Sequence, residues 1–593
     1  MFEKYLDTHR LEDLVAALPR RPFPAARERE VWEALPETRR AGLRRLAADY
    51  RETPYPLLTA GQFMAFGRDG DRAAFEAPYF LRRRKLCAAA LGICESGCLD
   101  DLGAVIDGIW LICEETGWAV SAHNPPELAL HDAEAPCLDL FAAQTAMILT
   151  LTCQLLDDAL DAASPLIVRR VRREIEARVL RPFEARDDFW WMGFTRRDLC
   201  NWTPWIVSNV MLSACAWIED APRLCRLLDR GCRMLDRYLE TLPADGGCDE
   251  GPGYWSMAGG ALLDCLELLE GVTGGSMAFW DDEKLRNVLR FPMNAWLCGP
   301  WFVNFADCDA RPEIPGERLQ FAGERLNDPA LRAFGACFRG DPSRELDDTP
   351  QLWRLLNALF RPLPPESDAI EPPGEVWLQD LQLRVVRSNG MVLACKGGVN
   401  EGSHNHNDCG SFILYADGGM QIVDAGNMTY TGKTFSGARY TLWNTRGRYH
   451  NVPVIGDMEQ VNGWSRRARA VRATQTGMTL DIADAYPGGV VSCQRTFALG
   501  EDCRLRDEIR LSAAQPVTEV FLLRHRPKLR ENAVVSGDIR IAPEAKMSVG
   551  IEEIPIDDPR MARQWPGSLW RVTFTDAPAA THDLKFRIER TPS

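Results

Sequence analysis

Three of the eight histidines lie in one stretch of the C-terminal half, His404 and His406 within EGSHNHNDCGSFILYADGGMQIVDAG and His450 farther on. If this stretch begins as a strand, the side chains of His404 and His406 share a face, because successive residues alternate. The runs SFILYADGG and MQIVDAG predict a hairpin with a glycine turn that brings Asp424 near the histidines. Two imidazoles and a carboxylate could hold zinc or a similar ion. The alternative is a solvated turn whose histidines bond to backbone carbonyls.

A second group of chemically able residues lies in PADGGCDEGPGYWSMAGGALLDCLELL, a glycine-rich acidic loop ahead of a predicted helix. Pro252 could occupy the first turn of that helix. Tyr254 and Trp255 would then lie near a helix N-terminus, where the dipole favours an anion or a tyrosinate. The alternative is that Asp249 and Glu250 only start the helix and that Tyr254 is a core aromatic residue.

A third group, CNWTPWIVSN, alternates amides with aromatic rings: Asn201, Trp202, Trp205 and Asn209. Rings can stack on the apolar faces of sugars, and amides can bond hydroxyls or a carboxylate. The alternative is a helix start with buried tryptophans. The segment GWAVSAHNPP adds His123, which as a lone loop histidine would usually be structural.

The elements that must position these residues change type near the middle of the chain. Up to about residue 360 the apolar spacing is helical, and the paired helices indicate an (α/α) toroid. Residues 361–374, RPLPPESDAIEPPG, hold five prolines and predict a linker. Short alternating runs follow, typical of antiparallel strands. We therefore predict an α-helical toroid domain over residues 1–372 and an antiparallel β-sandwich domain over residues 373–593.

Composition limits the partners. The chain has 593 residues, 84 acidic and 69 basic, with net charge −15, which argues against a nucleic-acid partner. We expect no membrane span, because no apolar run is long enough. The start, MFEKYLDTHR, has no basic segment followed by an apolar core, so we expect a cytoplasmic protein, or a periplasmic or secreted one if a leader was removed. The 19 scattered cysteines predict reduced, mostly buried thiols.

Together these motifs resemble the heparinase II/III-like polysaccharide lyases. The resemblance rests on SHNHNDCGSFILYADGGMQIVDAG, YHNVPVIGDMEQ, GWAVSAHNPP, LDLFAAQTA, NWTPWIVSN, DGGCDEGPGYW and WFVNFADCDAR, in the order of the family. It covers roughly residues 110–310 and 380–460. It implies a toroid, a β-sandwich and an active site in the cleft between them, where a uronate-containing polysaccharide or oligosaccharide is cleaved by β-elimination to 4,5-unsaturated uronate ends.

The resemblance also assigns roles to residues. It implies that Tyr254 and His404 are catalytic and that Asn201 lies next to the substrate carboxylate. Better-known relatives carry Asn-Asn-His where this chain has Cys200-Asn201-Trp202, so either His123 replaces that histidine or Asn201 and His404 suffice. The ligands of one structural divalent metal ion, usually zinc, would be His406, Asp424 and His450. We predict that substrate is bound by Trp202, Glu250, Trp255, Asn405 and Arg439.

β-Elimination needs a group that neutralises the carboxylate, a base and an acid. Asn201 with His123 or His404 would stabilise the enolate-like intermediate. Tyr254 would protonate the leaving oxygen and could be the base of a syn elimination, whereas His404 suits an anti elimination. A tyrosine base needs its pKa lowered by a helix N-terminus and by cations such as Arg439, Arg446 or Arg448.

Other functions remain open at this point. A glycoside hydrolase could use Asp249 and Glu250, although adjacent carboxyls rarely flank a bond from opposite sides. A metal-dependent hydrolase could use His404, His406 and Asp424, and a non-catalytic sugar-binding protein is a third alternative. The sequence leaves open the polymer, glycosaminoglycan or alginate, exo or endo action, and whether the chain forms a homo-oligomer.

Overall fold

The computed structural model describes residues 1–15, 21–347, 349–362, 370–402, 404–434 and 436–591. Two compact units share the chain. The helical unit comprises Met1–Thr241, Met257–Asp281 and Pro315–Asp368, and the β unit comprises Leu242–Ser256, Asp282–Ile314 and Ala369–Ser593. Residues 363–369, half of the predicted linker, lie outside the described residues, and the domain ends at 372 and 373 stay a prediction. The β unit thus includes two segments that lie between segments of the helical unit along the chain.

The predicted order of a helical region followed by an antiparallel β region is confirmed. The helices of the helical unit are α1 (Phe2–Leu6), α2 (Leu11–Leu14), α3 (Arg29–Glu33), α4 (Glu37–Arg51), α5 (Ala60–Asp69), α6 (Ala73–Ser96), α7 (Leu102–Cys113), α8 (Leu140–Leu155), α9 (Asp157–Ala163), α10 (Pro165–Ile175), α11 (Arg181–Ala185), α12 (Trp202–Trp217), α13 (Ala221–Thr241), α14 (Gly259–Val272), α16 (Gly316–Arg325), α17 (Pro329–Cys337) and α18 (Leu352–Phe360). The β unit holds α15 (Glu283–Asn294) and α19 (Met561–Gln564).

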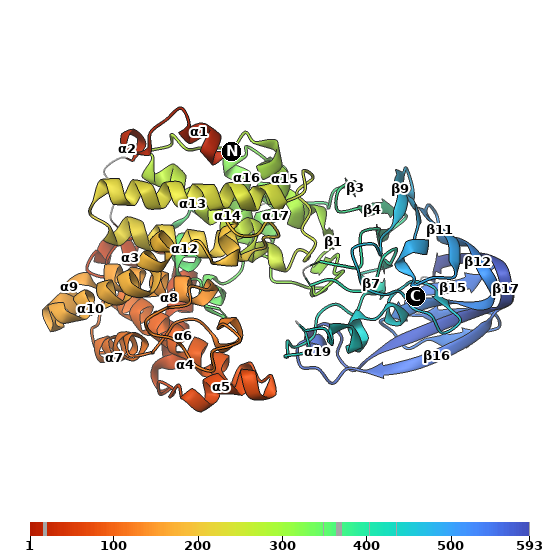
Figure 1. Cartoon of the computed structure of the whole chain (residues 1–593), viewed down its shortest axis with the longest axis horizontal. Helices are drawn as coiled ribbons and strands as arrows, with labels where there is room; N and C mark the ends of the chain where they lie inside the picture. Colours follow the sequence, from red (N-terminus) through yellow and green to blue (C-terminus); the bar gives the residue numbers. More distant parts are fainter. Residues whose placement is uncertain (16–20, 348, 363–369, 403, 435, 592–593) are drawn as a thin grey trace. The chain divides into compact units, whose positions relative to one another are not determined.

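The centre of the helical unit is α8, which is apolar on nearly every side and almost wholly buried. A helix without a polar face is stable only inside a protein. Asp139 caps it, because its carboxylate accepts the peptide N–H groups of Phe141 and Ala142. Against α8 packs α12, which also contacts α13 and α14 (Figure 1). In the described ranges no single helix is long and apolar enough to cross a membrane, and α8 with α9 would do so only as a pair bent by 85°.

The strands pair almost entirely within one antiparallel sheet. They are β1 (Trp296–Cys298), β2 (Trp301–Phe302), β3 (Glu375–Leu378), β4 (Leu383–Ser388), β5 (Met391–Lys396), β6 (Phe412–Ala416), β7 (Gly419–Ile422), β8 (Val454–Ile455), β9 (Arg469–Thr474), β10 (Gly477–Asp481), β11 (Val490–Leu499), β12 (Cys503–Leu523), β13 (Lys528–Arg530), β14 (Ala533–Ser536), β15 (Ile539–Pro543), β16 (Ser548–Pro555) and β17 (Ser568–Arg590). The main path runs β13-β14-β15-β17-β12-β7-β6-β5-β4-β3, and β1 pairs only with β2. Contacts of β10 with β4 and β5, and of β11 with β4, join two layers face to face as a sandwich.

The hairpin that the sequence predicts ahead of Asp424 is confirmed. β6 and β7 pair with Ala416 opposite Gly419, so the turn is Asp417-Gly418. Both turn residues have positive φ, 48° and 90°, as the tight turn that fits twisted strands requires. β7 then ends at Ile422, two residues before Asp424.

The core of the β unit is an apolar cluster crossed by one ionic network. Phe521 packs its ring against those of Phe412, Phe574 and Phe586. The cysteines of the chain are free thiols and most are buried, as predicted.

Arg495 is fully buried in this core and bonds to both carboxylates of Asp507 and Glu519 at 2.8–2.9 Å. Its Nη1 also donates to the carbonyls of Gly410 and Asn451, at 3.0 and 2.7 Å. The guanidinium therefore anchors the two segments that precede β6 and follow His450.

We predict that Arg495→Met lowers the free energy of unfolding by about 3–5 kcal/mol, because two buried acidic side chains, Asp507 and Glu519, lose their cationic partner. Chemical denaturation of the whole chain measures the change. The matched control is Arg506→Met on β12, where the ion pair with Asp583 is exposed, and we expect its denaturation midpoint to stay close to that of the wild type. Equal midpoints for Arg495→Met and the wild type would contradict this role of the network.

Candidate active site and metal centre

The segment that carries His404 and His406 is a loop, which corrects the strand expected from the sequence. The described residues between Asn400 and Ser411 form turns and bends ahead of β6. His404 has a left-handed φ of 57°, a conformation that is costly for a residue with a Cβ and is concentrated at functional sites. The peptide N–H of Asp307 donates to the His404 carbonyl at 3.1 Å and holds the loop in this shape.

His406, Asp424 and His450 are fully buried, and one ligand atom from each lies within 4.8 Å of the others. His450 Nδ1 is 2.9 Å from Asp424 Oδ2. In the described structure His406 Nδ1 and His450 Nε2 are buried without a hydrogen-bond partner. An imidazole nitrogen left so costs free energy, and a metal ion would relieve that cost. Two nitrogen donors and one oxygen donor fit zinc.

Asp307 joins the two loop histidines through one carboxylate. Its Oδ2 is 3.0 Å from His404 Nδ1, and its Oδ1 is 2.9 Å from His406 Nε2. Arg439 Nη2 is 2.9 Å from Oδ2. Burial raises the pKa of Asp307, but the hydrogen bonds from His404 and His406 and the charge of Arg439 outweigh it and hold the pKa below its ordinary value. The carboxylate is therefore ionised and can only accept hydrogen bonds.

Tyr254 lies beside His404 within the β unit. The two ring centroids are 4.6 Å apart. The hydroxyl of Tyr430 is hydrogen-bonded to that of Tyr254 and lies 3.1 Å from His404 Nδ1. Tyr430 therefore links the two residues that the sequence predicts to be catalytic.

Burial raises the pKa of Tyr254 well above the ordinary value of a phenol, although Arg560 and the hydrogen bond to Tyr430 oppose the shift. Tyr254 opens a short 3-10 turn, Tyr254–Met257, and does not sit at the start of α14. The lowered pKa that a tyrosine base would need is thus not found at Tyr254. At neutral pH Tyr254 is a protonated phenol, which suits a proton donor.

The arginines predicted to act on Tyr254 or on substrate have other partners. Arg439 is buried, and besides Asp307 it donates to the carbonyls of Asn405 and Thr434. Arg446 and Arg448 both pair with Glu459. The geometry thus gives no support to sugar binding by Arg439, which stays a prediction.

Other predicted substrate-binding residues of the β unit are also buried. Trp255 is 1% exposed and donates its Nε1–H to the Val288 carbonyl at 2.7 Å, so neither ring face is open for a sugar. Asn405 accepts the Tyr440 hydroxyl at 2.7 Å. Glu250 is 4% exposed, and burial raises its pKa to about 7. These three side chains therefore lie inside the protein, packed around the site.

The helical unit holds the remaining predicted residues. His123 Nδ1 is 2.7 Å from the Asp139 carboxylate, and the His123 ring lies 4.5 Å from that of Trp202. Asn201 occupies the N-cap position of α12 and is 8% exposed. Asp139 thus both caps α8 and orients His123. The catalytic and substrate-binding roles of His123, Asn201 and Trp202 stay predictions from the resemblance.

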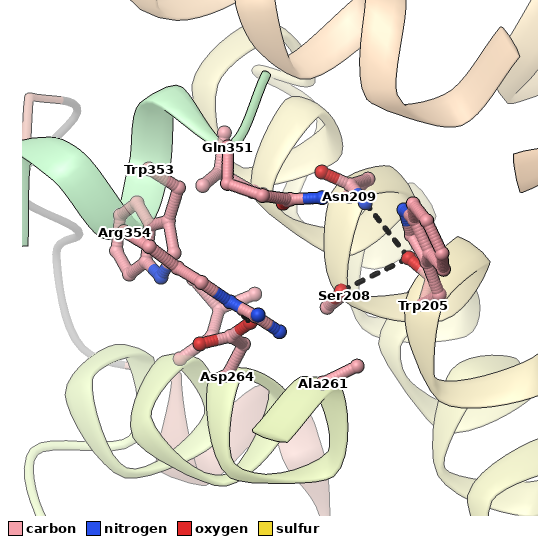
Figure 2. Close-up of a pocket in the computed structure, with 10 residues that line it drawn as sticks. Trp205, Ser208, Asn209, Ala261, Asp264, Gln351, Trp353 and Arg354 are labelled. Carbon is pink, nitrogen blue, oxygen red and sulfur yellow. Dashed lines mark hydrogen bonds and ion pairs between the residues drawn. The ribbon is translucent and has the colours of Figure 1, made fainter. Parts of the chain in front are cut away.

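Trp205 and Asn209, which the sequence groups with Asn201 for sugar binding, line a small cavity in the helical unit. Its volume is about 10 Å³, room for about one water molecule. Figure 2 shows these two residues on α12, facing Arg354 and Asp264, whose Nε and Oδ2 lie 2.8 Å apart. Trp205 and Asn209 are each 6% exposed, so they belong to the packed interior.

Sequence reasoning missed three residues of the site: Asp307, Tyr430 and Arg560. Asp307 lies in WFVNFADCDAR, which carries part of the family resemblance, but a lone aspartate there indicates no role. Tyr430 follows Asp424 by six residues, and its proximity was a usable signal. Arg560 lies 130 residues beyond Tyr430, its centre 5.5 Å from the Tyr430 ring, and no local pattern announces it.

Residues 371–581 match the family model described as Heparinase II/III-like, C-terminal. The matched segment contains His404, His406, Asp424 and His450. The resemblance stated from the sequence is confirmed over this part of the chain, which is similar to the Heparinase II/III-like C-terminal family. No curated protein sequence matches the chain.

Solved structures share the fold over most of the chain. A heparan sulfate lyase HepC mutant from Pedobacter heparinus has 15% identity and a TM-score of 0.59, with 88% of this chain and 77% of that chain covered. A heparinase III has 12% identity and a TM-score of 0.63, with 92% and 89% covered. The chondroitin AC lyase of Streptomyces coelicolor A3, in complex with chondroitin sulphate, has 11% identity and a TM-score of 0.51, with 93% and 83% covered. At such identities these similarities establish the fold alone.

The buried Glu250 predicts a pH dependence of stability. Its pKa is raised from 4.5 to about 7 in the folded chain, so the folded state keeps a proton that the unfolded state loses. Stability from this group is therefore full below about pH 4.5 and is lost by about pH 7, by up to about 3 kcal/mol. The free energy of unfolding of the wild type, minus that of Glu250→Gln, should fall over this window. Glu544→Gln, at an exposed position, should run parallel to the wild type, and a parallel Glu250→Gln curve would contradict the prediction.

Proposed function

We propose that the chain is a polysaccharide lyase that cleaves a glycosaminoglycan-type, uronate-containing chain by β-elimination. The observation that carries the proposal is the group of Tyr254, Tyr430 and His404, in which a phenol and an imidazole lie side by side. Support comes from the Heparinase II/III-like C-terminal match and from a fold shared with heparan sulfate and chondroitin lyases. Alginate is the second polymer class to test.

In this proposal His404 is the base and Tyr254 is the acid. His404 takes the C5 proton of the uronate, the C5–H electron pair forms the C4–C5 double bond, and the C4–O bond breaks. Tyr254 gives its phenolic proton to the departing oxygen, in keeping with the pKa that burial raises. Asn201 is proposed to neutralise the substrate carboxylate, as the family resemblance implies, and His123 is proposed to assist it in place of the histidine that better-known relatives carry.

The adjacency of the two rings bears on stereochemistry. An acid and a base whose ring centroids are 4.6 Å apart would meet one face of the sugar ring, which favours a syn elimination with His404 as the base, in place of the anti elimination that the sequence alone suggested for this histidine. In glucuronate the C5 proton and the C4 oxygen lie on the same face, whereas in iduronate they lie on opposite faces. We therefore propose that glucuronate is preferred over iduronate.

We also propose that His406, Asp424 and His450 hold one divalent ion, in keeping with their mutual distances and unpaired nitrogens. Zinc would be a structural centre that ties the β6–β7 hairpin to the His450 segment. The elimination consumes no water, so the proposal needs no metal-activated hydroxide.

The test is ultraviolet absorbance during incubation with heparan sulfate, chondroitin sulfate, hyaluronan, dermatan sulfate and alginate, as polymers and short oligosaccharides. A rising unsaturated-uronate signal, strongest on glucuronate-rich chains, is the expected result. New reducing ends without that signal would instead indicate a glycoside hydrolase. Faster reaction on iduronate-rich dermatan sulfate would overturn the syn proposal and leave the lyase proposal standing.

We predict that Tyr254→Phe lowers kcat by at least about 1000-fold, since proton transfer to the leaving oxygen is lost. The initial rate of the unsaturated product measures it, and circular dichroism checks the fold. Tyr55→Phe is the control, because the Tyr55 hydroxyl bonds the Ala104 carbonyl in the helical unit at 2.8 Å. A Tyr254→Phe rate close to that of the wild type would remove Tyr254 from the mechanism.

For the metal, we predict that the purified chain contains about one equivalent of zinc and that His450→Ala contains little. The variant loses a buried donor, so zinc at about 100 times the wild-type Kd should stabilise the wild type by about 2.7 kcal/mol and the variant much less. Elemental analysis and thermal unfolding with and without chelator give both quantities. His525→Ala, outside the cluster, should behave like the wild type. Equal zinc contents in wild type and His450→Ala would refute the ligand assignment.

A further inference from the structure

We propose that Asp307 is a positioning residue that couples His404 to the metal cluster, because one carboxylate fixes the proton placement and the orientation of both His404 and His406. The inference rests on the proposed function for the role of His404, and on the proposed metal centre for that of His406. Asp307 lies outside the family match of residues 371–581.

Asp307 determines where the protons lie on both rings. Its Oδ2 faces His404 Nδ1, and its Oδ1 faces His406 Nε2. Because a carboxylate that lies 2.9 Å from the Arg439 guanidinium accepts hydrogen bonds, each ring carries its N–H on the nitrogen that faces Asp307. The basic lone pair of His404 is then on Nε2, and that of His406 is on Nδ1.

The metal cluster gives independent support for this placement. His406 Nδ1, which should carry the lone pair, is the nitrogen of that ring found buried without a hydrogen-bond partner. His406 is also the histidine that groups with Asp424 and His450. A carboxylate behind a metal-binding imidazole raises its basicity and fixes its ring. Asp307 stands in that position toward His406 and in a similar position toward His404.

The backbone that carries Asp307 is held on both sides. Asp307 N–H donates to the His404 carbonyl, and the neighbouring Ala306 has a positive φ of 63°. The amide of Asn304 donates to the Asp424 carbonyl at 3.0 Å. Residues 303–309 therefore bond to the loop of His404 through the peptide N–H of Asp307, and to the segment of Asp424 through the side chain of Asn304.

A close approach shows how tightly this segment packs. A Cβ on Gly426, whose φ is 68°, would lie 2.3 Å from the Cys308 carbonyl oxygen. A Cβ on Gly251, whose φ is 83°, would lie 2.7 Å from Cys308 Cβ. Gly251, near Tyr254, and Gly426, near Asp424, thus let their two segments pack directly against Cys308. This packing leaves the backbone that carries Asp307 little freedom to move.

Arg439 completes the arrangement. Its guanidinium lies 2.9 Å from Asp307 Oδ2 and is itself fixed by the carbonyls of Asn405 and Thr434. The positive charge offsets the cost of burying a carboxylate. Asp307 is thus held by an ion pair with Arg439 and by hydrogen bonds with the imidazoles of His404 and His406.

The experiment compares Asp307→Asn, Asp307→Ala and the wild type for zinc affinity, by competition with a chromophoric chelator, and for kcat and KM on the responsive substrate. In Asp307→Asn the amide offers one acceptor and one donor, so one ring loses its acceptor. We expect zinc affinity to fall about 10–100-fold and kcat to fall about 100-fold, with KM within about 3-fold of the wild-type value. Asp481→Asn is the control, since Asp481 accepts the N–H groups of Ala483 and Cys493 away from the site; both readouts should stay unchanged.

Wild-type zinc affinity and kcat in Asp307→Asn would overturn the proposal. A loss of only one of the two would overturn the coupling, since the carboxylate would then serve a single histidine. If neither Asp307 variant folds, nitrogen-15 imidazole spectra of the zinc-loaded wild type decide, because the chain has only eight histidines. Nδ1–H on His404 with Nε2–H on His406 supports the proposal, and any other pair overturns it. A chain that binds zinc and shows these tautomers but yields no unsaturated uronate would refute the lyase function and leave the Asp307 assignment in place.

Discussion

The buried Asp307 carboxylate contacts two imidazoles and a guanidinium. The geometry of the site depends on these three contacts with one side chain. A buried carboxylate is costly unless every oxygen is paired. Each partner therefore stabilises the position of the others, and removal of one leaves a charge uncompensated. Three segments that are distant in sequence, around residues 307, 404 and 439, are held together by this requirement.

The rest of the β unit supplies the rigidity that such a site needs. His404 and Ala306 both have left-handed backbones, which cost of order 1 kcal/mol each, and the cost is offset by packing elsewhere. Arg495 contributes by bonding the carbonyls of Gly410 and Asn451, which follow the proposed metal ligands His406 and His450 in the sequence. The ionic network around Arg495 is thus connected, through the backbone at Gly410 and Asn451, to the segments that carry His406 and His450.

Local patterns in the sequence predicted the parts of this site that depend on local structure. The Asp417-Gly418 turn fixes the β6–β7 hairpin, so the approach of Asp424 to His406 and His450 followed from the spacing of turn residues. The strand expected at His404 was wrong, because contacts with Asp307 override the alternation of its neighbours. Stacking by Trp255 also finds no support, since only tertiary packing decides that its ring lies inside. Asp307 and Arg560 could not be predicted, because their roles arise from long-range contacts and each is an ordinary residue in its own segment.

The interleaving of the chain has an evolutionary consequence. The β unit takes Leu242–Ser256 and Asp282–Ile314 from between segments of the helical unit, and with them Tyr254 and Asp307. A recombination event at the proline-rich segment near residue 370 would join His404 to a new toroid but would separate it from Tyr254 and Asp307. The helical and β regions must therefore evolve together. A substitution that displaces Leu242–Ser256 or Asp282–Ile314 would be selected against because it disturbs the site in the β unit, even where the helices themselves tolerate it.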